Sequence, residues 1–210
     1  MRRSFVVPLA ALFVITGCNN TKEPSNANFI KAINQYLAKR DDACSSLGQT
    51  LPIDVTVPQQ KEQYGIGPQL AALEEAGLVH STNTTAMVHG MLDALWGSRP
   101  PQPVRRYELT DQGKQYYRQI PATFGQNGIF CYGQETVDSI IKWTEPATME
   151  GVTLSEVNYT YKIANLAPWA KRPDVQQAFP DLRQTLNGAS KANQIAELQL
   201  TNKGWEFPEL

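Results

Sequence analysis

The first 17 residues constrain the fold most, because they decide the compartment in which the rest of the chain folds. Arg2 and Arg3 precede an apolar run at positions 5–15, and Thr16 and Gly17 follow it. A basic start, a short apolar core and small residues at the end are the parts of a secretory signal peptide. The 11 positions of the run are too few for a transmembrane helix, which needs about 20 residues. We therefore expect residues 1–17 to be a signal peptide that is removed after export.

The end of this segment resembles the lipobox of bacterial lipoproteins. In Ile15-Thr16-Gly17-Cys18, an aliphatic residue stands three positions before the cysteine and a small residue directly before it. The resemblance implies that the Cys18 thiol receives a diacylglyceryl group and that the new amino terminus is acylated, for example with palmitate. Several chains, each worth about 0.8 kcal/mol per buried methylene, make such an anchor effectively permanent. The alternative is an ordinary signal peptide with a chance cysteine.

The residue after the cysteine and the charge of the mature chain bear on location and partners. In lipoproteins an aspartate after the cysteine often retains the protein at the inner membrane, whereas this chain has Asn19. The resemblance therefore implies a lipid-anchored protein of the cell envelope, at the outer membrane and facing the periplasm. Removing residues 1–17 takes away two of 19 basic residues and leaves 17 against 20 acidic ones. An acidic balance does not attract nucleic acid, and we expect no nucleic-acid partner.

Two cysteines remain besides Cys18, namely Cys44 and Cys131. In an oxidising compartment an even remainder indicates a disulfide. The bridge would close a loop of almost ninety residues, which the chain-entropy model values at roughly 4 to 5 kcal/mol of stability. The alternative is two separate buried thiols.

Composition divides the chain after the signal peptide into a polar tether at 18–28 and two α+β domains. The first domain, 29–124, is expected to open with an amphipathic helix from Phe29 to about Ala43, capped by Asn26 or Asn28. Positions 83–103 give no clear pattern. The other expected elements are a strand at 51–57, a helix from Pro68 to Gly77, strands at 78–81 and 107–109, and a Thr110-capped helix that carries Tyr116 and Tyr117.

The second domain, 125–210, follows an expected linker at 124–128 and is rich in strand. Positions 129–143 predict one or two strands separated by Gly133. The clearest strand is 154–163, where apolar and polar residues alternate. A helical excursion is expected at 168–186, with Pro173 and Pro180 at helix starts. Alternation at 196–200 and a turn before Trp205 predict a final hairpin. The fold class is therefore α+β, ending in a small antiparallel β-rich part.

Part of the first domain resembles the winged-helix domains of small bacterial regulators. The resemblance covers about residues 29–120, with an insertion at 81–103, and it implies a winged-helix-like fold. In such regulators wing arginines contact DNA phosphates, and Arg105 and Arg106 occupy that place. Export and the acidic charge argue against that role, since a fold does not fix a function. The matching residues are Leu70, Leu73, Gly77, Leu78, Tyr107, Leu109, Thr110 and Gly113.

The whole chain, through its lipobox and the run at 159–182, also resembles a group of uncharacterised proteobacterial lipoproteins. That resemblance implies an envelope location and no particular activity.

The residues that usually carry catalysis form no known motif in this sequence. His80 and His89 have neither metal-site nor triad spacing, and we expect no metal and no cofactor. Ser139 and Lys142 spell Ser-x-x-Lys, but they fall in a strand rather than on one side of a helix, so we treat the match as chance. The acidic pairs 41–42 and 74–75 are interpreted as solvated helix faces.

Large aromatic residues in the second half can build either a β-domain core or a recognition surface. A binding patch is predicted if Trp169 lies exposed beside Lys171 and Arg172. The aromatic residues concerned are Trp143, Tyr159, Tyr161, Trp169 and Trp205.

The leading hypothesis for function is a noncatalytic interaction module that contacts another envelope protein or the cell wall. The rival is an envelope hydrolase or transferase whose acid is assembled only in the fold. A pocket holding a desolvated carboxylate with a raised pKa would favour the rival.

Overall fold

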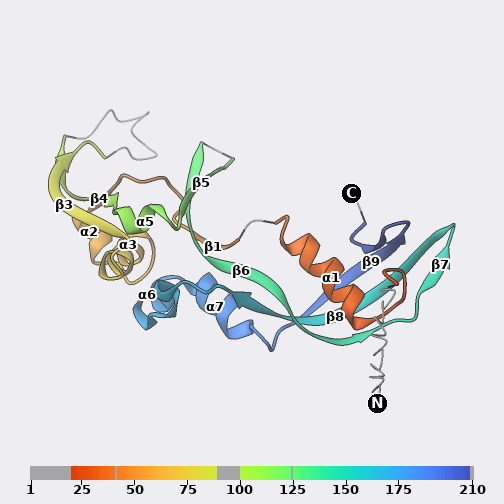
Figure 1. The fold of residues 1–210 in the computed structure, drawn as a ribbon. Coiled ribbons are helices and arrows are strands. Elements are labelled where there is room, and N and C mark those ends of the chain that lie inside the picture. Colours follow the sequence, from red (N-terminus) through yellow and green to blue (C-terminus); the bar gives the residue numbers. More distant parts are fainter. Residues whose placement is uncertain (1–19, 41, 89–99, 124, 209–210) are drawn as a thin grey trace, which may run out of the picture.

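The structure, a computed structural model, describes residues 20–40, 42–88, 100–123 and 125–208 (Figure 1). It is mixed α/β and is dominated by a curled antiparallel sheet. This large sheet has seven strands in the described residues, in the order β1-β6-β8-β9-β10, with β5 on β6 and β7 on β8. Its strands are β1 (Ala43–Ser46), β5 (Tyr117–Pro121), β6 (Gln126–Trp143), β7 (Ala147–Met149), β8 (Val152–Ala164), β9 (Asn193–Thr201) and β10 (Gly204–Glu206).

Two long strands, β6 and β8, form the centre of this sheet. The alternation at 154–163 correctly predicted β8, whose Val157, Tyr159 and Tyr161 are buried on one face. β6 is one strand of 18 residues. Gly133 does not interrupt it; a Cβ there would lie 2.5 Å from Ile163 Cγ2, so the missing side chain admits the neighbouring strand. The predicted final hairpin is also present, as β9 and β10.

The first helix, α1 (Asn26–Leu37), packs against the large sheet rather than within an N-terminal domain. Its Phe29 and Ile33 are fully buried in one core with Val157 and Trp205. The predicted domain of 29–124 is therefore wrong at its start, because the apolar face of α1 is buried by residues from the end of the chain. The N-cap is Ser25, whose side chain accepts from Asn28 N, and not Asn26 or Asn28. The helix also ends six positions before Ala43.

A second sheet, with three strands in the part of the chain that the structure describes, has the order β2-β4-β3. The expected strands at 51–57 and 107–109 are present, and β3 runs on into the segment that gave no clear pattern. Residues 89–99 lie outside the described residues. The helix predicted from Pro68 begins at Ile66, and Gly77 ends it with φ +75°. The elements are β2 (Ile53–Thr56), β3 (Val79–Ala86), β4 (Gln102–Leu109), α2 (Val57–Gln60), α3 (Ile66–Glu75) and α5 (Asp111–Lys114).

The helix α5 is shorter than predicted, and the strand β5 follows it. The Thr110 side chain caps it through Gly113 N at 2.9 Å, as expected. The helix ends at Lys114, so Tyr116 lies beyond it and Tyr117 begins β5. The expected linker at 124–128 is wrong over 126–128, which belong to β6 and pair with β5. Residue 124 lies outside the described residues.

The helical excursion at 168–186 is confirmed as η1 (Pro168–Lys171), α6 (Pro173–Ala178) and α7 (Pro180–Gly188). Its Phe179 and Leu182 are fully buried in a core shared with Phe130 of β6 and Leu70 of α3. A core that mixes residues from both halves means that the predicted boundary at 124/125 does not separate two cores. No helix of the described residues has the length and hydrophobicity needed to cross a membrane.

Candidate functional site

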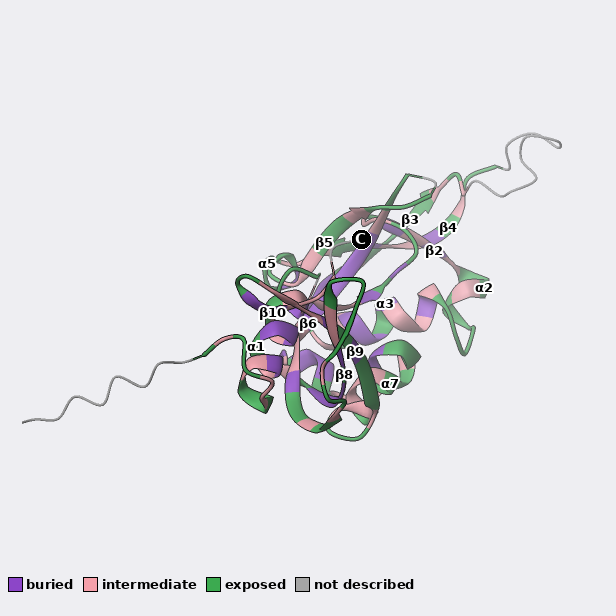
Figure 2. Ribbon diagram, turned by 90° about the vertical axis from the view of Figure 1, so that its right-hand side faces the viewer, coloured by how far each residue is buried: buried purple, intermediate pink, exposed green. Residues whose placement is uncertain are grey.

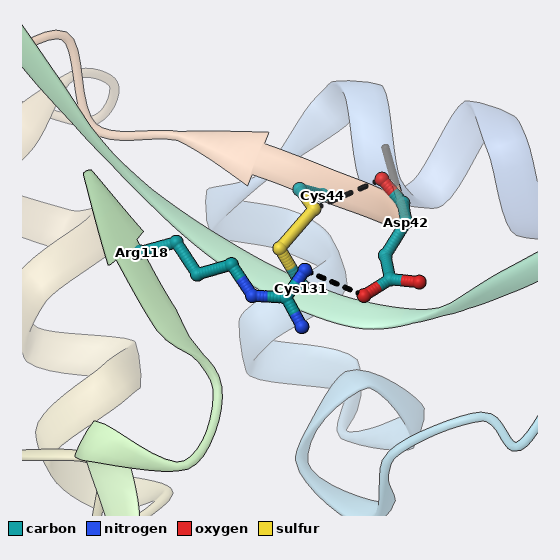
Figure 3. The surroundings of a disulfide bond; sticks show 4 residues. All are labelled: Asp42, Cys44, Arg118 and Cys131. Atoms are coloured by element: carbon teal, nitrogen blue, oxygen red, sulfur yellow. Dashed lines mark hydrogen bonds and ion pairs between the residues drawn. A yellow bond between two sulfur atoms is a disulfide. The ribbon is translucent and has the colours of Figure 1, made fainter. Parts of the chain in front are cut away.

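The predicted disulfide between Cys44 and Cys131 is present in the structure (Figure 3). The two residues face each other in the register of β1 and β6. Beside the bridge, Arg118 of β5 donates to Asp42 at 2.7 Å. The bridge therefore joins the two ends of the segment that carries the small sheet.

The predicted patch around Trp169 is wrong in its central residue. Trp169 is only 3% exposed and makes edge-to-face contacts with Tyr116, Phe130 and Tyr132. Its ring fills the core between the helical excursion and the sheet. Of the two roles that the sequence allowed for this residue, core and recognition surface, the structure therefore gives it the first. Lys171 remains exposed beside it. Arg172 forms a bidentate pair with Asp174, at 3.1 and 2.8 Å.

The histidines and the Ser-x-x-Lys string show no catalytic arrangement in the described residues. His80 lies 3.5 Å from Glu108, and both side chains are about half exposed in a shallow cleft of about 340 Å³. His89 lies outside the described residues. Ser139 and Lys142 are in β6, and the Ser139 hydroxyl hydrogen-bonds the Thr160 hydroxyl at 2.8 Å.

The two wing arginines are engaged in ion pairs. Arg105 donates to Glu74 at 2.7 Å and also to Ser81. Arg106 forms a bidentate pair with Asp54, at 2.8 and 2.7 Å. Arg105 therefore ties β4 to α3, and Arg106 ties β4 to β2. The charge of both guanidinium groups has a structural role.

Among the described residues, three carboxyl groups have a displaced pKa, and all three pKa values are lowered. The hydrogen bond from Arg106 holds the pKa of Asp54 below its ordinary value. Hydrogen bonds from Lys114 and Arg172 do the same for Asp111 and Asp174. Lowered values are those of ion-paired carboxylates, whereas a general acid needs a raised pKa.

Replacing Asp54 with asparagine should lower stability at neutral pH and flatten its acid dependence. A depressed folded-state pKa adds stability that is present above the unfolded pKa of about 3.9 and is lost as pH falls through the folded value. The difference between the parent and the variant in urea unfolding should therefore be largest at neutral pH and shrink on acidification. Asp111→Asn is the control, because Asp111 is 98% exposed and its pair with Lys114 is expected to contribute little. An equal effect of both substitutions would contradict this expectation.

The sequence reading missed one site, which we call the N-terminal junction: residues 20–25, the facing side of α1 and the β9–β10 turn. The predicted tether is wrong from residue 20 onward, since this segment is bonded to the fold. Asn28 Nδ2 donates to the backbone oxygens of Asn20 and Glu23, both at 2.9 Å. Trp205 Nε1 donates to Lys22 O at 3.2 Å.

A glycine in the β9–β10 turn makes this junction possible. Gly204 has φ +121°, and a Cβ there would lie 2.8 Å from the Thr21 backbone oxygen. The turn therefore needs glycine both for its conformation and for the close approach of the N-terminal segment. The signal available in the sequence was the asparagine-rich stretch, in which Asn28 bonds to Asn20 and Glu23. The contact that ties the segment to the hairpin joins Lys22 to Trp205, 183 positions away.

The junction encloses a small cleft of about 160 Å³ with a polar lining. Lys31, Lys203 and Gln35 line it, together with Asn28, whose amide is already bonded to Asn20 and Glu23. Its one lining acid, Glu206, accepts a hydrogen bond from Thr201 at 2.8 Å. Two lysines in the lining suit an anion such as a phosphate group.

The described residues contain no group of three or more His, Cys, Asp or Glu side chains that could hold a metal ion. Comparison of the chain with models of protein families, with curated proteins and with solved structures gives no match.

Proposed function

We propose that this protein is a lipid-anchored component of the cell envelope that acts as a noncatalytic interaction module. The anchor is Cys18, in the lipobox-like run. The fold uses Cys44 and Cys131 in a disulfide, which leaves Cys18 as the one cysteine outside it. Cys18 also stands two residues before the described fold begins at residue 20. A single free cysteine at that place is what lipid attachment requires.

The observation that carries the module proposal is a pair of exposed isoleucines, Ile141 and Ile195, on the outer face of the large sheet. Strand alternation puts Val157 and Tyr159 of β8 on the face that packs against α1 and puts Asn158 and Thr160 on the opposite, outer face, where both are buried. There the polar groups are paired, with Asn193 Nδ2 donating to Asn158 at 3.0 Å and Asn158 Nδ2 donating to Glu156 at 3.1 Å. These two hydrogen bonds satisfy the amide group of Asn158, so a partner bound over it would not leave that group unpaired.

Two isoleucines stand exposed on this part of the sheet. Ile195 is 64% exposed and lies opposite Asn158 in the register of β8 and β9. Ile141 is 55% exposed, at the bulge of β6 next to the same residue. Large apolar side chains exposed over hydrogen-bonded polar groups suit a protein interface, whose centre is apolar. The partner class is therefore another envelope protein rather than wall glycan.

We propose that the α3–β3–β4 part retains a winged-helix-like arrangement as a scaffold without DNA binding. Its Arg105 and Arg106 are held by Glu74 and Asp54, which supports a structural role for both.

A photo-reactive residue at position 195 should capture a discrete protein partner in intact cells. The matched control is the same residue at position 171, because Lys171 is also exposed but lies in the helical excursion. Ile195→Asp together with Ile141→Asp should reduce recovery of the same partner by tenfold or more, since a few central residues dominate interface energy by about 2 kcal/mol each. Equal capture from both positions, capture of glycan alone, or no adduct would contradict the proposal. Far-UV circular dichroism checks that the variants remain folded.

A further inference from the structure

The place where the fold begins fixes which end of the molecule faces the membrane, if Cys18 carries the anchor as proposed above. Residues 20–25 are held by Asn28 and Trp205. Two residue steps separate Asn20 from Cys18, and two steps of chain span at most about 7 Å. A bilayer that holds Cys18 must therefore lie directly against the N-terminal junction, and no long tether can lift the protein away.

The charge of the junction matches such a surface. Lys22, Lys31 and Lys203 are all exposed there. The nearby acids are Glu206, which is half-buried and hydrogen-bonded to Thr201, and the exposed Glu23. Basic residues are therefore in excess at the junction, although acidic residues outnumber basic ones in the chain after residue 17. Anionic phospholipids attract each basic side chain near the bilayer surface.

The same end of the sheet also presents apolar side chains. Figure 1 shows the start of the described chain, the β9–β10 turn and β7 at one end of the molecule. At the β7–β8 turn, Met149 is 73% exposed and Val152, its partner in register, is 38% exposed. The end of β6 is tied to the start of α1, since Trp143 Nε1 donates to Asn26 Oδ1 at 3.1 Å. Figure 2, which looks onto this end, shows exposed residues along its strands.

We propose that the N-terminal junction is a membrane-binding surface for anionic phospholipids. Lys31 and Lys203 hold a lipid phosphate at the polar cleft, and Lys22 lies against the neighbouring headgroups. Met149 and Val152 contact the interfacial region beside them. The acyl anchor supplies the strength of attachment and this surface supplies its orientation.

The test attaches the protein to vesicles without relying on acylation in cells. In the oxidised chain from residue 18 onward, Cys18 is the single free thiol, so it can be coupled to a maleimide-bearing lipid. The vesicles contain phosphatidylglycerol, with pure phosphatidylcholine as comparison. Acetylation of lysines, read by mass spectrometry, should fall at least fivefold at Lys22, Lys31 and Lys203 on anionic vesicles. Lys114 and Lys171, on other elements, should react as in the uncoupled protein.

Replacing single lysines with glutamine measures how much each charge contributes to vesicle binding. With the uncoupled chain, Lys31→Gln and Lys203→Gln should each weaken binding to anionic vesicles about fivefold, the factor for about 1 kcal/mol per basic residue at an anionic surface. Lys114→Gln and Lys171→Gln are the matched controls and should have no effect.

Several results would overturn the surface assignment. These are uniform protection of all lysines, equal protection on phosphatidylcholine, an equal effect of the control variants, or the same protection by inorganic phosphate alone, which would indicate a small-anion site. A lack of acylation in cells would overturn the anchor but would leave the vesicle result standing, so the two failures can be distinguished.

Discussion

Replacing both Cys44 and Cys131 with serine should lower the free energy of unfolding by about 4 to 5 kcal/mol. The disulfide spans 87 positions, and in the chain-entropy model a long closed loop removes much of the freedom of the unfolded chain. The loss is a large part of the roughly 5–15 kcal/mol that stabilises a typical domain. It is large here also because the bridge fastens β1 to β6 at the base of the segment that carries the small sheet.

Urea unfolding of the chain from residue 18 onward, in a Cys18→Ser background, measures this loss. The Cys18→Ser protein itself is the control, since its disulfide is intact. Its unfolding midpoint should equal that of the chain that keeps Cys18. A double variant that unfolds within about 1 kcal/mol of this control would show that the bridge contributes little, far below the chain-entropy value.

Replacing Cys18 with serine should move the protein almost completely from the membrane fraction to the soluble periplasmic fraction. Acyl chains contribute about 0.8 kcal/mol per buried methylene, whereas the junction lysines contribute about 1 kcal/mol each. The lysines alone therefore leave binding weak and sensitive to salt. We expect at least a tenfold drop in the membrane-bound share at physiological ionic strength.

The control for this fractionation is the Cys44→Ser and Cys131→Ser double variant. It loses the disulfide but keeps Cys18, so the part of it that folds should stay with the membrane. A Cys18→Ser protein that remains bound to membranes after a high-salt wash would contradict the proposed anchor.

Features set by local patterns could be predicted from the sequence. The alternation in β8, the prolines that begin α6 and α7, and the Thr110 cap all depend on neighbouring residues. The disulfide followed from counting the cysteines in a chain expected to be exported. Each of these rests on short-range chemistry or on a small number of combinations.

Features set by distant partners could not be predicted. The sequence showed the apolar face of α1, but no neighbouring residue indicated that Trp205 and Val157 would bury it. Trp169 could have been core or surface, and the choice depends on Tyr116 and Phe130, far earlier in the chain.

The N-terminal junction is the clearest example of this limit. A polar stretch with proline is typical of a tether. The segment is held instead because the Trp205 indole donates to Lys22 O across 183 positions and because Gly204 leaves room for Thr21. Neither contact has a counterpart in local composition, so the candidate membrane surface became visible only in the fold.

The mass of the N-terminal peptide, from protein extracted out of cell membranes, tests the anchor most directly. We predict a peptide that begins at Cys18 and carries a diacylglyceryl group on sulfur and an acyl chain on its amino group. A peptide that still begins at Met1, with an unmodified Cys18, would contradict the account.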